Sequence, residues 1–443
     1  MKVLILALFF AAYLGILFKR EWGLFFVYGA VSILLLSGAI FPQQIFSFIN
    51  WNVLGIFLGT TILSYLFIFS GIPSFWIESI IKKGFSLPVC YLLICAFTGL
   101  ISTFMENVAT ILLMAPIAFE FSRKLKLNPV PLFIGMAISS NLQGCATMVG
   151  DSPSIIMALE TGMNFNDFFW LNGRPGIFFS VQIGAILGYI VLYLFFRKIN
   201  TPLKQDFSKI EKVNLVRSKS SEVTATPLVG TSIRVKSWFP LHLLGLFIMS
   251  FALGSLFLAG EFEFYPAFLA LGWGMVGIVW QLIFHREKIS FKRDIDWASF
   301  FLLAGIFILV GSLNSAGIIG DFSNKLSQFS SHPFGLYNVI VWTSVLISGF
   351  VDNIPYAMAM ISAIKLLAGS LNLSVYPYVF GLLLGTCIGG NITPIGASAN
   401  IVAVGLLKKE GYHVRFSQFV KIGLPFTLVS VIGSCLVNWL IWR

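Results

Sequence analysis

Two acidic residues, each followed by asparagine, interrupt long apolar stretches of the chain: Glu106-Asn107 and Asp352-Asn353. A charged side chain at the centre of a bilayer costs about 2.5–3.5 kcal/mol on insertion scales. Asparagine favours helix starts, where free N–H groups and partial positive charge stabilise a carboxylate. The pattern therefore predicts two carboxyl groups at helix starts within the membrane, able to bind a cation or a proton. The alternative is that both acids only cap helices.

Two further stretches, 139–154 and 389–400, are rich in glycine, proline, asparagine and threonine. Glycine and proline at this density break a helix, and broken backbone in a bilayer is tolerated only where it is buried in protein or lines a cavity. The freed carbonyls, with asparagine and threonine oxygens, suit a hard cation, whereas the freed N–H groups suit an anion. The alternative is a purely structural kink.

The two pairs and the two broken stretches give one candidate ion-binding set. Asp151 adds a third carboxylate, and no lysine or arginine is expected at the same depth. An acid-rich site without a base favours a cation, a proton or a neutral solute over a polycarboxylate. The predicted ligands are Glu106, Asn107, Thr147, Gly150, Asp151, Ser152, Asp352, Asn353, Asn391, Thr393, Gly396, Ser398 and Asn400.

The composition indicates that these residues belong to a membrane protein. Of 443 residues, 57% are apolar and 11% are charged, against about 25% charged in globular chains; the mean hydropathy is +0.90. Apolar stretches near the roughly 20 residues of a spanning helix recur at 2–18, 22–40, 51–70, 131–160, 175–196, 239–258, 265–284, 297–314, 376–408 and 422–442. Two more apolar regions, 84–122 and 334–371, carry the acidic pairs.

Several other classes of protein are disfavoured. The net charge of +11 comes from lysines and arginines in loops, as the positive-inside rule requires, so no nucleic-acid partner is expected. The five cysteines have no metal-ligand spacing, and no nucleophile–base pair is apparent. We therefore expect no enzyme activity, no resident metal and no cofactor. The chain has no phosphate-binding loop of an ATPase, although a separate ATPase subunit stays possible.

The chain also repeats itself. With an offset of 246 residues, 51–155 aligns with 297–401 without a gap and with 23 identities in 105 pairs. The identities fall on glycine, proline, asparagine and threonine as well as on apolar residues: Asn107 aligns with Asn353, and Thr147 aligns with Thr393. Repeats of this kind indicate two structurally equivalent halves.

The basic residues set the predicted orientation of the halves. The polar stretch 197–238 is predicted to be a cytoplasmic linker. If 84–122 and 334–371 each enter and leave the membrane on one side, 24 of the 29 lysines and arginines lie in the cytoplasm. This arrangement has about ten full crossings and places both termini outside. The two repeats are then inverted, which puts a substrate site near the midplane.

The predicted fold is therefore an all-α polytopic membrane protein with two inverted-topology repeats. Each repeat contains a re-entrant hairpin and a discontinuous transmembrane helix. The predicted divisions are two helices in 1–50, the first repeat in 51–196, the linker in 197–238, two helices in 239–296 and the second repeat in 297–443. The expected location is a bacterial-type cytoplasmic (inner) membrane.

Motifs in these segments resemble the ion transporter superfamily, especially its branch of arsenite permeases, D-type sodium/proton antiporters and P proteins. The resemblance covers roughly 50–440 and rests on 106–116, 128–153, 351–355 and 389–400. It implies a scaffold like that of the sodium–dicarboxylate carriers, as a homodimer. The chain departs from the P-protein pattern at Glu106 and at 143–145, and it lacks the serine–asparagine–threonine tips of the dicarboxylate carriers.

The leading functional prediction is secondary active cation (Na+)/proton antiport with alternating access, Na+ or H+ being the coupling ion. Proton-coupled efflux of arsenite or another metalloid, transport of a small organic or inorganic anion such as citrate, and a passive anion channel are the alternatives. The expected partners are a small ion or small anion, the lipid bilayer and a second copy of the chain.

Overall fold

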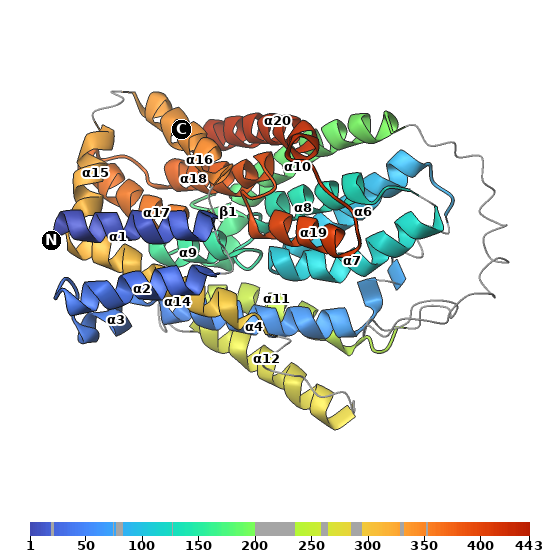
Figure 1. Cartoon of the computed structure of the whole chain (residues 1–443), viewed down its shortest axis with the longest axis horizontal. Coiled ribbons are helices and arrows are strands. Elements are labelled where there is room, and N and C mark those ends of the chain that lie inside the picture. Colours follow the sequence, from blue (N-terminus) through green and yellow to red (C-terminus); the bar gives the residue numbers. More distant parts are fainter. Residues whose placement is uncertain are drawn as a thin grey trace.

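The computed structural model describes residues 1–18, 22–73, 75–76, 83–125, 127–199, 235–257, 265–284, 295–327, 332–350 and 353–443. Asp352 and most of the predicted linker, residues 200–234, lie outside the described residues. The described secondary structure is helical except for two short antiparallel strands, β1 (Trp170–Leu171) and β2 (Arg174–Pro175). The all-helical prediction is confirmed, and the helices lie mostly along the long axis of the molecule (Figure 1).

The helices before the linker include two pairs that the broken and acidic stretches connect. They are α1 (Lys2–Phe18), α2 (Gly23–Leu36), α3 (Pro42–Phe48), α4 (Trp51–Phe69), α6 (Leu87–Ser102), α7 (Asn107–Lys124), α8 (Val130–Gly144), α9 (Ser152–Thr161), the 3-10 helix η2 (Phe165–Phe168) and α10 (Ile177–Arg197).

The helices after the linker follow a similar order. They are α11 (Phe239–Phe257), α12 (Tyr265–Phe284), α14 (Trp297–Ser315), α15 (Ile318–Ser327), α16 (Pro333–Ser348), α17 (Asn353–Ser370), α18 (Tyr376–Gly389), the 3-10 helix η4 (Gly390–Ile392), α19 (Ser398–Lys409) and α20 (Phe416–Trp442).

Helix starts in the second half follow those in the first at a constant interval. The helices α4, α6, α7, α8 and α9 begin 246 residues before α14, α16, α17, α18 and α19. The same interval aligns the sequence, so equivalent residues occupy equivalent places in equivalent helices. Each half contains a pair of helices joined at an acidic tip and a helix that breaks and resumes.

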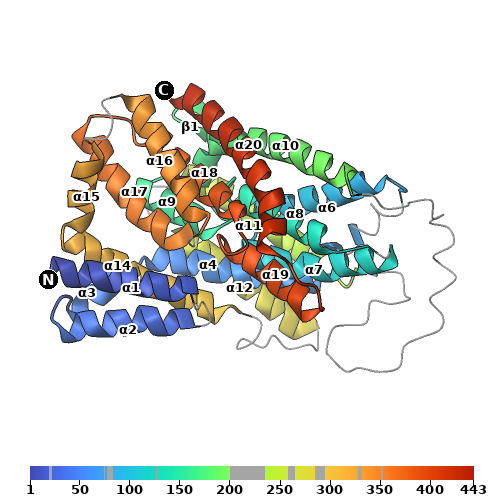
Figure 2. The ribbon, with the colours of Figure 1, turned by 45° about the horizontal axis from the view of Figure 1, so that its top comes forward.

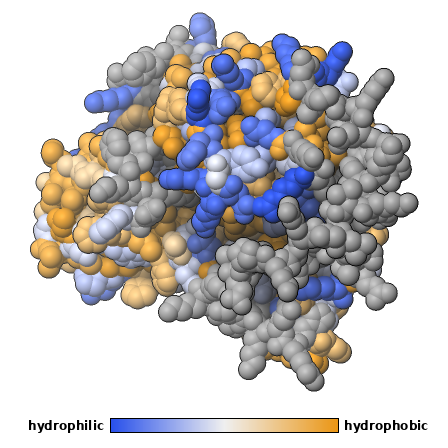
Figure 3. Space-filling model, turned by 45° about the vertical axis from the view of Figure 1, so that its right-hand side comes forward, coloured by the Kyte–Doolittle hydropathy of each residue, from blue (hydrophilic) through white to orange (hydrophobic). Residues whose placement is uncertain are grey.

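Five described helices are long and apolar enough to cross a membrane: α4, α10, α12, α14 and α20. Shorter apolar helices include α1, α2, α6, α11 and α16. Large apolar side chains are exposed on the outer helices, as in a protein surrounded by lipid. Figure 3 shows hydrophobic side chains at the left and top of the view, with a cluster of hydrophilic side chains near its centre.

The centre of the molecule is built by the first parts of the two broken helices. Every residue of α8 is buried except Pro131, and every residue of α18 is buried except Tyr376. Around them α10 and α20 run side by side (Figure 2). A Cβ on Gly184 of α10 would lie 1.9 Å from the Ser434 hydroxyl oxygen of α20, so glycine allows the close approach that membrane helices use for packing.

Candidate functional site

The tip between α6 and α7 places a carboxylate at a helix start, as predicted. Glu106 is the N-cap of α7, and its Oε2 atom accepts hydrogen bonds from the backbone N–H groups of Val108 (2.7 Å) and Ala109 (3.1 Å). These N–H groups have no partner within the helix, and the positive end of the helix dipole stabilises the charge. The second carboxylate oxygen makes no cap bond, so it is available to a ligand.

Asparagine follows the acid at both tips and is held in the same way in each half. The Ser102 hydroxyl donates to Asn107 Oδ1 at 2.5 Å. At the equivalent place, the Ser348 hydroxyl donates to Asn353 Oδ1. Each asparagine is the first residue of its helix, and its side chain is hydrogen-bonded to the last residue of the preceding helix.

The two broken stretches pack against the tips. In the first half the Thr147 hydroxyl donates to the Thr103 carbonyl; in the second half the Thr393 hydroxyl donates to the Gly349 carbonyl at 2.5 Å. Gly150 and Gly396 lie at the same contacts: a Cβ would lie 2.9 Å from the Thr103 carbonyl oxygen in one half and 2.8 Å from that of Gly349 in the other. These four predicted residues join the breaks to the tips.

Asp151 starts α9 and is buried, with 4% of its surface exposed. Its Oδ1 atom accepts from the backbone N–H (3.0 Å) and the hydroxyl (2.5 Å) of Ser154. Its Oδ2 atom accepts from the Cys387 thiol of α18 at 3.2 Å. The equivalent residue before α19 is Ala397, which has no side-chain acceptor to offer. The two halves therefore differ in charge at this place.

Hydrogen bonds between asparagine side chains connect the first repeat to the second at the centre of the molecule. The Asn141 side-chain amide of α8 donates to the Oδ1 atoms of Asn391 (2.8 Å) and Asn400 (2.9 Å). The Asn400 amide donates in turn to the Gly390 and Thr393 carbonyls, both at 2.9 Å. Asn391 and Asn400, predicted as ion ligands, thus belong to a network that fixes the second break.

A cavity of about 40 Å³ lies where the tips and the restarting helices meet. Roughly 10–15 Å³ of such volume holds one water molecule, so the cavity has room for about three water molecules or for one small ion with one or two waters. Two carboxylates line it, and none of the described residues lining it is a lysine, arginine or histidine. The lining residues are Glu106, Asn107, Asn141, Asp151, Ser152, Pro153, Asn353, Ile354, Ala397, Ser398 and Ala399.

The described site residues that were predicted from the sequence form two groups, according to whether they line the cavity. Those that line it are Glu106, Asn107, Asp151, Ser152, Asn353 and Ser398. Those that instead hold the loops around it are Thr147, Gly150, Asn391, Thr393, Gly396 and Asn400. The predicted set omitted Asn141 and Cys387, although each stands within a broken helix and the 246-residue offset makes them equivalent.

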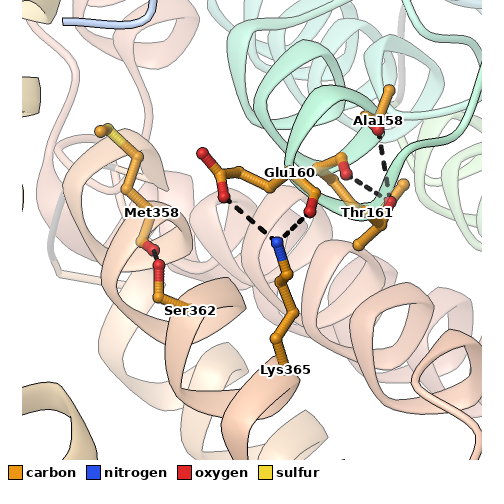
Figure 4. A network of polar contacts seen from close by, with 7 residues as sticks. Ala158, Glu160, Thr161, Met358, Ser362 and Lys365 are labelled. Atoms are coloured by element: carbon orange, nitrogen blue, oxygen red, sulfur yellow. Dashed lines mark hydrogen bonds and ion pairs between the residues drawn. The ribbon is translucent and has the colours of Figure 1, made fainter. Parts of the chain in front are cut away.

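A larger cavity, of about 430 Å³, lies at the far end of α9 beside α17. Lys365 of α17 donates to the main-chain carbonyl of Glu160, and its Nζ atom is 3.5 Å from the Glu160 carboxylate (Figure 4). Glu160 is eight residues after Ser152, about 12 Å along the helix. An ion pair with both partners partly exposed contributes only about 0–1 kcal/mol. This cavity is therefore separate from the two carboxylates.

Comparison with known proteins decides the family. A family model described as "Citrate transporter" (CitMHS) matches residues 13–385. The chain belongs to the CitMHS family. The predicted resemblance to the ion transporter superfamily is confirmed, because the homologues also include P proteins.

The relatives of this CitMHS family member include proteins named as transporters and P proteins. An uncharacterized transporter of Mycobacterium tuberculosis is 27% identical over 453 residues, covering 99% of this chain and 98% of that protein. A second uncharacterized transporter of the same species is 26% identical over 401 residues, covering 88% and 86%. The P protein of Mus musculus is 26% identical over 403 residues, covering 77% of this chain and 48% of that protein.

Among solved structures, the YdaH transporter of Alcanivorax borkumensis has a similar fold. The TM-score is 0.57 at 14% sequence identity, and the match covers 88% of this chain and 84% of that one. This likeness concerns the fold alone. The family, the relatives and the apolar helices together make the protein a multi-pass membrane transporter.

Proposed function

We propose that the protein exchanges Na+ for protons across the membrane as a secondary active transporter. The observation that carries this proposal is the cavity of about 40 Å³ lined by the carboxylates of Glu106 and Asp151, without a base among its described lining residues. Oxygen ligands suit a hard cation. In this conformation the cavity is far too small for citrate, and its charge would repel a polycarboxylate.

The proposed mechanism uses the two carboxylates as a shared site for both ions. Each can be neutralised by a proton or by Na+, and ionisable groups within membranes commonly serve as such relays. Asn107, Asn353, Ser152 and Ser398 line the same cavity, and their amide and hydroxyl oxygens are the further ligands that we propose. Because Na+ and protons compete for the same oxygens, occupation by one drives release of the other.

The proposed architecture is the inverted repeat with about ten crossings, two re-entrant hairpins (α6–α7 and α16–α17) and both termini outside. It is supported by the constant 246-residue interval between helix starts and by α4 and α14, which lead toward opposite ends of the molecule in Figure 1. Inverted repeats support alternating access around a central site. Asp352 is proposed as the acid of the second tip. We propose a homodimer in a bacterial-type cytoplasmic membrane.

Transport of a small anion is the second candidate. The description of the family model as a citrate transporter favours it. So does the start of α19 at the cavity, where Ala397 provides no carboxylate to offset the positive helix end. Free N–H groups at a helix start attract anions. The two acidic side chains on the other side of the cavity oppose it, and we therefore rank it second.

Proton flux in proteoliposomes with a preset pH gradient separates the two candidates. We expect Na+ alone to dissipate the gradient, with saturation, because it displaces protons from the carboxylates. Liposomes without protein and addition of K+ are the controls. If Na+ and Li+ have no effect while citrate, another anion or arsenite moves protons, the antiport proposal is wrong. Unsaturable flux of chloride would indicate a passive channel.

A further inference from the structure

The two broken helices each send one side chain across to the other half, at equivalent positions. Asn141 of α8 contacts the second half, and Cys387 of α18, which the 246-residue offset makes its equivalent, contacts the first half. The pair of contacts is therefore related by the internal repeat, but the chemistry differs. Asn141 donates two amide hydrogen bonds to Asn391 and Asn400, whereas Cys387 donates a single thiol hydrogen bond to Asp151.

The two oxygens of Asp151 are satisfied to different degrees. Oδ1 accepts two bonds from Ser154, at 3.0 and 2.5 Å. Oδ2 accepts a hydrogen bond from the Cys387 thiol at 3.2 Å, and a thiol is a weak donor. The nearby Cys145 thiol donates elsewhere, to the Leu142 carbonyl at 3.1 Å. Oδ2 therefore has more unused hydrogen-bonding capacity than Oδ1 has, and it is the oxygen better able to coordinate a cation.

We infer that Cys387 is a positioning residue that donates a weak hydrogen bond to Asp151 Oδ2. The weakness of this bond sets the affinity of the cavity for its cation. A stronger donor at position 387, such as the amide that Asn141 provides at the equivalent position, would compete with the cation for Asp151 Oδ2. The affinity for the cation would then be lower. Without a donor, this oxygen would be fully available to coordinate the cation. This inference rests on the proposed function, because it assumes that Asp151 binds a cation.

Two substitutions change the strength of the hydrogen bond donated to Asp151 Oδ2 in opposite directions. Cys387→Ser introduces a stronger donor of similar shape, and Cys387→Ala removes the donor. At one alkaline pH, where protons compete least, we expect the half-saturating Na+ concentration to rise in Cys387→Ser and to fall in Cys387→Ala. Each change is expected to be roughly two- to tenfold, the range of one hydrogen bond. Maximal rates should change less.

A matched control is available at Cys95, a fully buried cysteine of α6 outside the cavity lining. Cys95→Ser and Cys95→Ala should leave the half-saturating Na+ concentration as in the wild type. A role in packing alone would move both Cys387 variants in the same direction. Such a common shift, or no shift relative to the Cys95 variants, would overturn the inference.

Infrared spectroscopy of the sulfhydryl stretching band tests the contact itself, without transport. Cys387→Ala identifies the band, and a hydrogen bond to a carboxylate lowers its frequency. We expect Asp151→Asn, which leaves a weaker acceptor, to raise the frequency, and saturating Na+ to do the same in the wild type. An unchanged band in Asp151→Asn would refute the contact. If the contact is found but Na+ neither binds nor is transported, the proposed function has failed, and with it the assigned role of Cys387.

Discussion

Asp151→Asn is expected to reduce Na+-driven proton flux by at least about tenfold, because a polar interaction with a charged group contributes roughly 1.5–3 kcal/mol. Asparagine is as good an N-cap as aspartate, so its oxygen can still accept from Ser154 and α9 should still form. The loss is therefore expected in transport and not in thermal unfolding of the purified protein. Initial rates of flux in proteoliposomes, at matched protein content, measure it.

Asp167→Asn is the matched control for this change. Asp167 lies in η2, outside the cavity, and its Oδ2 atom accepts from the Asn164 backbone N–H at 2.7 Å, a role that the amide oxygen of asparagine can fill. Transport should stay near the wild-type rate. Full activity of Asp151→Asn would show that Asp151 is only a helix cap.

Glu106→Gln is expected to reduce coupled flux by a similar factor, again at least about tenfold. The glutamine oxygen can replace Oε2 as acceptor for the N–H groups of Val108 and Ala109, so the start of α7 is preserved while the charge is lost. We expect the pH dependence of the remaining flux to flatten, because one of the two proton-binding groups is gone. Rates measured across a series of pH values test this.

The control for Glu106→Gln is Glu160→Gln, which removes the same charge at the larger, separate cavity. Its ion pair with Lys365 is partly exposed, and such pairs contribute little. Near wild-type flux is expected. If Glu160→Gln reduced coupled flux as much as Glu106→Gln does, the effect would not be specific to the carboxylates of the central cavity.

Much of the arrangement follows from the sequence because the repeat fixes it. The offset found among identities such as Asn107 and Asn353 is also the interval between helix starts. Glycine and proline mark both breaks in the sequence. Glu106 caps α7, because a carboxylate in an apolar segment has few other stable places. Glu106 and Asp151 both line the cavity, and their role as ion ligands stays a prediction.

The direction of each side chain could not be predicted in the same way. Asn391 and Asn400 have the ligand chemistry of a cation site, but both accept hydrogen bonds from Asn141, which is more than 240 residues away in the chain. The Cys387 contact with Asp151 spans 236 residues and depends on how α18 packs against α9. Sequence spacing within a helix carries no information on such contacts between helices.

The central claim is that Na+ and protons share the carboxylates of Glu106 and Asp151. Calorimetric titration of the purified protein with Na+, in two buffers of different ionisation enthalpy at one pH, measures binding and proton release together. We expect a buffer-dependent heat that reports released protons, and loss of both binding and release in the double variant Glu106→Gln/Asp151→Asn. Na+ binding without proton release, or binding that survives in the double variant, would contradict the account.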